Sequence, residues 1–328
     1  MSEKLYALTG ATGHVGYALL KEMLAHGDKT RILIRKDPGY FKGMDVEMVK
    51  GDVTDYDSLV KAFAGCDTVF HLAGCVEIKA GFEEKIRQIN VDGTKNVVKA
   101  CFASGVKRLV YMSSVDTYPP LPGNEEMTEI YKYAPTVLEG AYAKTKAEAT
   151  VFVLDSQGQN GLDVVVVQPA ACMGPYDFKV SSVGSMIRMF MDGKFPVTLK
   201  FGGYNFVDVR DVALLTRAAA EKGTPGSCYI ACNKMCTVDE FIKLLAEACG
   251  TKAPKIGLGH GFCNLIAPLA EVYYKAADKT PLFTRYSIRK LCSNCNFSYA
   301  KAAEELGYSP RPLLVSLKDT VAWIRENE

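Results

Sequence analysis

The chain has 328 residues and a formal net charge of +2; 48% of its residues are hydrophobic and 23% are charged. This composition is that of an ordinary soluble protein with ample material for a core, and it argues against nucleic acid or an anionic membrane as the main partner. No basic and apolar leader precedes the first predicted strand, and the longest late apolar stretch is too short to cross a bilayer. We therefore expect a cytoplasmic protein with no nucleic-acid and no membrane partner.

A glycine-rich turn lies near the start of the chain. Residues 9–16 read TGATGHVG, between an apolar strand predicted at 4–8 and a helix predicted at 17–24. Glycines spaced three apart let the backbone turn sharply and admit a pyrophosphate to the helix start, where unpaired N–H groups and the helix dipole face an anion. The turn is predicted to bind a dinucleotide. Plain loop chemistry is the alternative, and the flanking strand and helix favour the binding site.

The second predicted strand, 30–35, ends in two basic residues, Arg35 and Lys36. In a dinucleotide-binding fold an acid at this place accepts the ribose 2′-hydroxyl of NAD, whereas a base accommodates the 2′-phosphate of NADP. We expect NADP as the cofactor. NAD is the alternative, because Asp37 follows directly and is itself able to reach a ribose.

Strand and helix units of about 30 residues repeat through the first half of the chain and predict right-handed crossovers. The further strands are expected to end near 49–53 and to lie at 68–74, 107–114 and 164–168; further helices are expected from 55, at 83–104 and at 142–154. The fold class is therefore α/β, a doubly wound parallel sheet of the Rossmann type. His71, inside the run 68–74, is expected to be a satisfied core group rather than an acid or base.

From residue 180 onward the strand and helix units stop and helical patterns prevail, at 185–191, 239–249, 262–277 and 298–307. We predict a Rossmann domain at 1–178 and a mixed, mainly helical substrate lobe at 179–328. Within the second range, residues 205–232 are predicted to pack as part of the Rossmann domain. The substrate is expected in the cleft between them.

Hydroxyl and phenol groups follow the fifth predicted strand. Ser113 and Ser114 end it, and Tyr142 and Lys146 lie four apart on one face of the next helix. The ammonium is predicted to lower the pKa of Tyr142 from about 10 toward neutrality, a range useful for proton transfer. The alternative is that Tyr142 and Lys146 are an exposed aromatic residue and a lysine with no catalytic role. The preceding serines in a nucleotide-binding fold favour the catalytic interpretation.

The chain contains 11 cysteines. Their odd number and their position in apolar segments favour reduced thiols over disulfides. The spacings of Cys292 with Cys295, and of Cys228, Cys232 and Cys236, would also suit zinc, but no histidine is near either group and small buried thiols explain both. We predict no metal site.

Taken together, these motifs resemble the extended short-chain dehydrogenase/reductase superfamily (the NAD-dependent epimerase/dehydratase superfamily), and within it the dihydroflavonol-4-reductase-like branch. The resemblance covers nearly the whole chain. It is carried by residues 9–16, Asp52, 70–73, 113–114, 142–146, 168–175 and 205–213.

The resemblance implies roles for single residues. Ser114 would polarise the substrate carbonyl, Tyr142 would protonate its oxygen as hydride arrives, and Lys146 would hold the nicotinamide ribose. Tyr118, four residues after Ser114, matches an aromatic that follows the catalytic serine in the family. Asn90 would support the site. The implied cofactor contacts are Gly10, Thr12, Gly13, His14, Val15, Arg35, Lys36, Asp52, Val53, Leu72, Ala73, Gly74, Ser113, Tyr142, Lys146, Pro169, Ala171 and Cys172.

One departure from the family pattern bears on the reaction. Sugar-nucleotide epimerases usually carry an arginine in the sixth strand and an asparagine before its proline, and residues 164–168 (VVVVQ) offer neither. This favours an NADPH-dependent reductase of a ketone or aldehyde, reversible as an alcohol dehydrogenase. A nucleotide-sugar epimerase or dehydratase with bound NAD is the alternative, and a non-catalytic NADP-binding regulator is a third hypothesis.

The substrate is expected to be an apolar small molecule. The residues expected to line its cleft are the methionines of 185–191, Phe178, Phe201, Tyr204 and Phe283. The helices expected at 83–104 and 142–155 are suited to pairing two copies into a homodimer, although nothing in the sequence requires it.

Overall fold

A seven-stranded parallel sheet forms the centre of the fold in the computed structural model, which describes residues 4–76, 81–119, 121, 123–130, 132–276 and 284–327. The strand order is β10-β6-β5-β4-β1-β2-β3. The strands are β1 (Leu5–Thr9), β2 (Lys29–Ile34), β3 (Glu47–Lys50), β4 (Thr68–His71), β5 (Arg108–Met112), β6 (Asp163–Pro169) and β10 (Cys228–Ala231). The predicted doubly wound α/β fold is confirmed.

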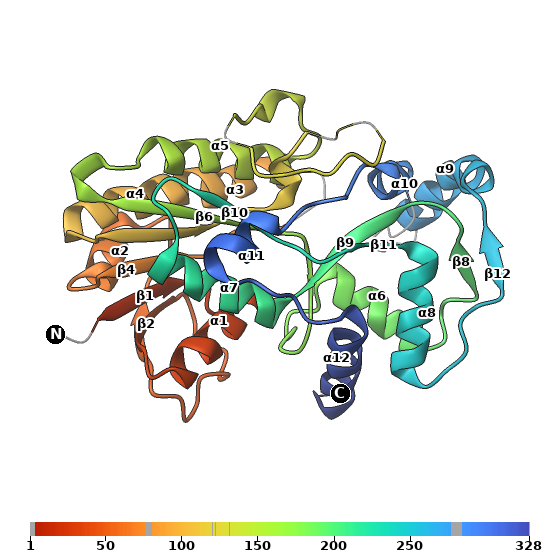
Figure 1. The fold of residues 1–328 in the computed structure, drawn as a ribbon, viewed down its shortest axis with the longest axis horizontal. Coiled ribbons are helices and arrows are strands. Elements are labelled where there is room, and N and C mark those ends of the chain that lie inside the picture. The colour runs from red at the N-terminus through yellow and green to blue at the C-terminus, as the bar shows by residue number, and fades with distance from the viewer. Residues whose placement is uncertain are drawn as a thin grey trace.

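Helices cover both faces of this sheet (Figure 1). On one face lie α1 (His14–Ala25), α7 (Val209–Lys222) and α11 (Ala300–Leu306). On the other lie α2 (Tyr56–Phe63), α3 (Glu83–Arg87), α4 (Gly93–Ser104) and α5 (Ala141–Asp155). Short 3-10 helices are η2 (Val115–Thr117), η3 (Pro135–Val137) and η4 (Gln159–Gly161).

Burial on both faces explains why the strands are almost continuously apolar. In β6, Val165 and Val167 belong to the core shared with α1 and α7, whereas Val164 and Val166 belong to the core shared with α4 and α5. Side chains alternate between the faces of a strand, so a strand covered on both sides needs apolar residues at every position.

The helix predicted at 83–104 is interrupted. A π-helical turn, η1 (Gln88–Asp92), lies between α3 and α4. It carries the buried Asn90, whose amide bonds the backbone of Cys75 and the hydroxyl of Thr145. A π turn inserts an extra residue per turn and often occurs at functional sites, and here it places Asn90 below the loop that follows β4.

The second half of the chain contains strands as well as helices. Its strands are β7 (Ala171–Met173), β8 (Val197–Leu199), β9 (Gly203–Asp208), β11 (Met235–Thr237) and β12 (Ile256–Leu258), in the sheets β11-β9-β7 and β12-β8. Its helices are α6 (Ser182–Met191), α8 (Val238–Cys249), α9 (His260–Ala276), α10 (Arg285–Cys292) and α12 (Leu313–Asn327). Most of these elements lie at the end of the molecule remote from the N-terminus (Figure 1). The predicted domain boundaries stay a prediction.

Among the described residues, no helix combines the length and the apolar character that crossing a membrane requires.

Candidate active site

The glycine-rich turn joins β1 to α1 at the carboxyl edge of the sheet. Gly10 has a φ of +81°, and a Cβ there would lie 2.6 Å from the backbone nitrogen of Ala73. A Cβ on Gly16 would collide with the carbonyl oxygen of Gly10. The N-cap residue of α1 is Gly13, which has no side chain that could cap the helix. The backbone N–H groups of the first turn are therefore available to an anion.

A cavity of about 270 Å³ opens between this turn and the end of β2; we call it the β2 cavity. It is lined by Thr9, Gly10, Thr12, Gly13, Leu33, Ile34, Arg35, Gly51, Asp52, Val53, Leu72, Ala73, Gly74, Cys75, Lys85, Ile89 and Lys179. Arg35 Nε lies 3.7 Å from an oxygen of Asp52. Lys179 Nζ donates a hydrogen bond to the hydroxyl of Thr12 over 3.0 Å. Burial, and then the charge of Arg35, lower the pKa of Lys179.

A larger cavity of about 600 Å³, the central cavity, lies at the carboxyl ends of β1, β4, β5 and β6. The catalytic candidates Ser114, Tyr142 and Lys146 all line it. So do the predicted cofactor residues Gly10, Gly13, His14, Val15, Leu72, Gly74, Ser113, Pro169, Ala171 and Cys172. Its other walls are mainly apolar: Val76, Met112, Val115, Val183, Met186, Phe206 and Leu291.

Ser114 and Tyr142 both line the central cavity, and the Ser114 hydroxyl lies close enough to the phenol of Tyr142 to influence its pKa. The Ser114 hydroxyl oxygen also accepts a bond from the backbone N–H of Asp116 over 3.1 Å and thereby caps η2. Burial first, and the charge of Asp116 second, raise the pKa of Tyr142 above its ordinary value, although the neighbouring Ser114 hydroxyl lowers it. The predicted lowering of this pKa by Lys146 is therefore wrong, because burial of the phenol outweighs any nearby positive charge.

Lys146 is buried and points toward β5. Its Nζ donates to the hydroxyl of Tyr111 over 3.1 Å and to the carbonyl oxygen of Met112. Burial lowers the pKa of Lys146 to about 7. A Cβ on Gly74 would lie 3.8 Å from the same nitrogen, so the missing side chain leaves a path to the lysine from the loop after β4.

The side chains that lie behind Tyr142 and Lys146 are polar and are hydrogen-bonded to one another. The ring of His71 is hydrogen-bonded to the hydroxyls of Thr9, over 2.8 Å, and Thr94, over 3.0 Å. Burial lowers the pKa of His71 to about 3, so the ring is neutral. The expectation that His71 is a satisfied core group is confirmed. Ser113 bonds Thr150 over 2.7 Å, which leaves Ser114 as the hydroxyl that faces Tyr142.

Nearly all predicted site residues meet at the two cavities. The exception is Lys36, which is exposed and lines neither cavity. Of the aromatics expected around the substrate, Tyr204 lines the central cavity, whereas Phe178 stacks on Tyr40 with ring centroids 4.2 Å apart and Phe201 packs against α9. Phe283 lies outside the described residues.

Of the predicted methionines on α6, Met186 lines the central cavity. Met191 packs against the core around α8 and α12 instead.

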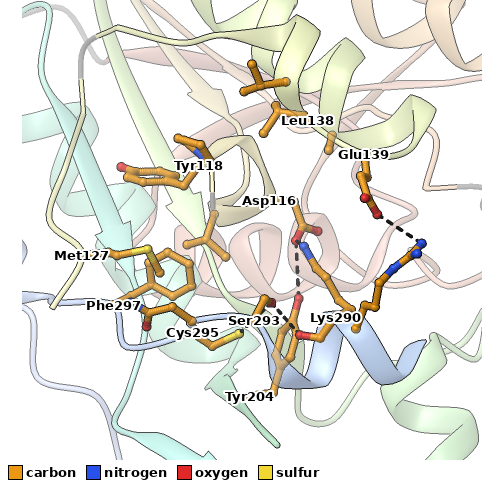
Figure 2. A pocket seen from close by; sticks show the side chains of 16 residues that line it. Asp116, Tyr118, Met127, Leu138, Glu139, Tyr204, Lys290, Ser293, Cys295 and Phe297 are labelled. Atoms are coloured by element: carbon orange, nitrogen blue, oxygen red, sulfur yellow. Dashed lines mark hydrogen bonds and ion pairs between the residues drawn. The ribbon is translucent and has the colours of Figure 1, made fainter. Parts of the chain in front are cut away.

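A third cavity, of about 290 Å³, lies beside the central one and shares Val115, Asp116 and Tyr204 with it; we call it the α10 cavity (Figure 2). Figure 2 shows Lys290 reaching Asp116, with a nitrogen-oxygen distance of 2.6 Å. The Tyr204 hydroxyl donates to the same carboxylate over 3.4 Å. Asp116 thus links the serine loop to α10.

Sequence reasoning missed Lys179, Asp116 and Lys290. Asp116 follows Ser114 by two residues, and this proximity to the predicted catalytic serine could have indicated a role at the site. The two lysines come from a loop and a helix far along the chain, and no spacing links them to the site.

The described residues fit a bound dinucleotide. The β2 cavity and the central cavity share Gly10, Gly13, Leu72 and Gly74, so one extended molecule would run from Arg35 past the start of α1 to Tyr142. Fold and site together define an NAD(P)-dependent oxidoreductase of the extended short-chain dehydrogenase/reductase type. The chain belongs to the NAD dependent epimerase/dehydratase family, whose family profile matches residues 6–232. The predicted family is thereby confirmed.

Several named proteins are similar to this chain over most of its length. Sterol demethylase protein B of Methylococcus capsulatus is 33% identical, over 97% of this chain and 98% of that protein. A putative dihydroflavonol 4-reductase of Synechocystis is 28% identical, over 98% and 95%. The 3beta-hydroxysteroid-dehydrogenase/decarboxylase isoform 1 of Arabidopsis thaliana is 31% identical, over 84% of this chain and 66% of that protein.

Solved structures share the fold. The crystal structure of gox2253 superposes with a TM-score of 0.86 at 28% identity, covering 99% of this chain and 98% of that one. A nucleoside-diphosphate-sugar epimerase from Pseudomonas aeruginosa gives a TM-score of 0.79 at 21% identity, covering 99% of both chains.

Proposed function

We propose that the protein is an NADPH-dependent reductase of an apolar ketone or aldehyde, reversible as an alcohol dehydrogenase, with a steroid-like polycyclic ketone as the preferred substrate class. The observation that carries the proposal is the meeting of Ser114, Tyr142 and Lys146 in one cavity with mainly apolar walls. Similar relatives are named for sterols and hydroxysteroids, which supports a substrate of this kind.

Bound NADPH would supply the hydride that reduces the carbonyl carbon. The Ser114 hydroxyl would donate a hydrogen bond to the carbonyl oxygen, and its own oxygen is already held by the N–H of Asp116. Tyr142 would transfer its phenolic proton to the same oxygen as negative charge develops there, so that an alcohol forms. Since burial raises the pKa of Tyr142, the phenol carries its proton at neutral pH, which suits the direction of reduction.

Lys146 would hold the cofactor ribose. Its nitrogen lies beneath the open loop at Gly74 and is fixed by Tyr111 and Met112. A ribose hydroxyl placed between Lys146 and Tyr142 would connect the phenol to the lysine, and it would offset part of the effect of burial on the phenol.

Two of the three cationic side chains that line the β2 cavity support NADP over NAD. Arg35 and Lys179 line it together, and the positive charge of Arg35 is one reason for the lowered pKa of Lys179. A 2′-phosphate between them would relieve this repulsion, whereas a bare ribose hydroxyl would leave it in place. Asp52, which lies 3.7 Å from Arg35, is the group that would compete for the arginine.

The test is a turnover assay that compares substrate classes. Purified protein is incubated with NADPH or NADH and with ketosteroids, alicyclic ketones and aldehydes, or with UDP-glucose, while cofactor consumption and product are followed. The proposal expects net NADPH consumption with the apolar carbonyl compounds and loss of it in Tyr142→Phe. Conversion of UDP-glucose with no net change in a tightly held NAD would replace it by the epimerase alternative. Binding of NADPH without turnover of any class would favour the regulator.

A further inference from the structure

The α10 cavity adjoins the central cavity at a shared wall, which is formed by Val115, Asp116 and Tyr204. Val115 directly follows Ser114, so this wall begins beside the hydroxyl that would orient the substrate carbonyl. The volume of the α10 cavity, about 290 Å³, is close to the lower limit of about 300 Å³ for ligand pockets. A molecule held at Ser114 therefore has a second compartment next to it, large enough for part of a ligand.

The lining of the α10 cavity has an apolar part and a charged part. Its buried apolar residues are Val115, Tyr118, Met127, Leu138, Ala143, Cys295 and Phe297. Figure 2 shows Met127 and Phe297 together on the side of the cavity away from Lys290. An alkyl group placed against this apolar side would be removed from water, which is favourable in proportion to the area that it buries.

The charged lining residues neutralise one another. Lys290 Nζ lies 2.6 Å from an oxygen of Asp116, and a guanidinium nitrogen of Arg289 lies 3.6 Å from an oxygen of Glu139. The described lining residues thus carry two positive and two negative charges. A charged group on a ligand would have to compete with one of these ion pairs, whereas an alkyl group leaves both of them intact.

Uncharged polar groups of the lining are hydrogen-bonded within the fold. The Tyr118 hydroxyl donates to the side-chain oxygen of Gln168 over 2.8 Å. The Asn294 amide donates to the carbonyl oxygen of Glu125 over 2.8 Å, and the Ser293 hydroxyl donates to a backbone carbonyl oxygen over 2.6 Å. A polar ligand would have to exchange these bonds for its own and would gain little. The α10 cavity therefore favours an apolar, uncharged group.

We propose that the α10 cavity is a second substrate subsite, which takes an alkyl extension of the ketone whose carbonyl lies at Ser114 and Tyr142. The preferred substrate is then a neutral ketone that carries an alkyl chain of several carbons on its ring system. A short ketone would occupy the central cavity alone. The inference rests on the proposed function for the position of the carbonyl, but binding of the chain needs no hydride transfer and can be measured without turnover.

The experiment measures the affinity of the full chain, loaded with oxidised NADP, for cyclohexanones that carry a methyl, butyl or octyl group opposite the carbonyl. Oxidised NADP has no hydride to give, so the ketones stay intact. Affinity should rise about three- to fourfold for each methylene until the chain fills the α10 cavity. Ser293→Phe fills part of this cavity and should bring the ratio of butyl to methyl affinity close to one. Leu138→Ala removes an apolar contact and should lower the ratio of octyl to methyl affinity about fivefold.

Leu245→Ala is the matched control. Leu245 is also a buried leucine, but it belongs to the core around α8 and α12 and lines neither the central nor the α10 cavity. This variant should keep the wild-type affinity ratios, and unfolding temperatures should show that all three variants fold. Affinities that do not rise from the methyl to the octyl compound would overturn the inference. So would wild-type ratios in both Ser293→Phe and Leu138→Ala.

Turnover of the same ketones with NADPH separates this inference from the proposed function. We expect kcat/KM to increase with chain length in the same order as the affinities. Chain-dependent binding with no NADPH consumption would support the subsite and overturn the proposed reaction. NADPH consumption at one kcat/KM for all three ketones would support the reaction and overturn the subsite.

Discussion

Lys146 reaches Tyr111 on β5, with its Nζ 3.1 Å from the hydroxyl oxygen and 4.5 Å from the ring centroid. Tyr142 instead shares the central cavity with Ser114, whose hydroxyl lowers the pKa of the phenol. The lysine and the proposed proton donor thus have separate partners before a cofactor ribose joins them. This arrangement separates the roles of the two tyrosines, of which Tyr111 is fully buried and Tyr142 is partly exposed, and makes them experimentally distinguishable.

Replacing each tyrosine by phenylalanine should have opposite effects on activity and stability. Tyr142→Phe removes the transferred proton and should lower kcat by about a thousandfold, with cofactor affinity changed little. Tyr111→Phe removes a partner of Lys146 and should lower the free energy of unfolding by about 1 kcal/mol while most of the turnover remains. Steady-state kinetics and denaturant unfolding of the two variants check this. Equal loss of turnover in both would mean that Tyr142 has no special role.

Stability of the cofactor-free protein should depend on the protonation of Lys146. Its pKa is about 7 in the folded state, against an ordinary lysine value of 10.5 in the unfolded chain, so the folded state binds fewer protons in between. Stability therefore rises with pH through this window. Relative to Lys146→Met, the wild-type free energy of unfolding should increase by about 1.5 kcal/mol from about pH 7 to about pH 8.5. Parallel curves for the two proteins would show that the lysine is not buried in this way.

Cofactor preference should depend on the β2 cavity. Arg35→Ala and Lys179→Ala should each weaken NADPH binding by about tenfold or more, since each removes a charged bond to the 2′-phosphate, and should leave NADH binding unchanged. Lys36→Ala is the control, because Lys36 is the neighbouring cation that does not line the cavity. Calorimetric titration of both cofactors measures the effect. Equal losses for NADPH and NADH would argue against a phosphate at this place.

The glycine turn can be tested with two glycines of similar backbone conformation. Gly10 and Gly27 have φ values of +81° and +76°, but a Cβ at Gly27 meets nothing within 4 Å, whereas at Gly10 it meets Ala73 and Leu72 at 2.6 Å. Gly27→Ala should cost about 1 kcal/mol of stability from backbone strain alone. Gly10→Ala should cost clearly more and also abolish NADPH binding. Thermal unfolding with and without cofactor separates the two, and similar losses in both variants would contradict a tight turn.

The sequence was sufficient for features that local chemistry specifies. Glycine spacing predicted the turn from β1 to α1, and apolar runs predicted strands buried on both sides. It also predicted one site for Ser114, Tyr142 and Lys146. The serine follows a strand whose carboxyl end lies at the ligand edge of the sheet, whereas the tyrosine and lysine were assigned from their helical spacing and from the family resemblance. All three line the central cavity.

Features that depend on burial or on distant segments were not predictable in this way. The pKa of Tyr142 is raised because the fold removes the phenol from water, and a spacing of four residues carries no information about solvent. Lys179 and Lys290 reach the two ends of the site from segments with no periodic link to it. The π turn at Asn90 similarly interrupts a pattern that is helical throughout.

The most direct test of the account follows the hydride itself. NADPH deuterated at the transferred nicotinamide position is incubated with the protein and a ketosteroid, and the alcohol product is analysed by mass spectrometry, with Tyr142→Phe in parallel. The account predicts one deuterium at the carbinol carbon in the wild-type product and almost no product from the variant. An unlabelled product, or a labelled product formed equally well by Tyr142→Phe, would contradict it.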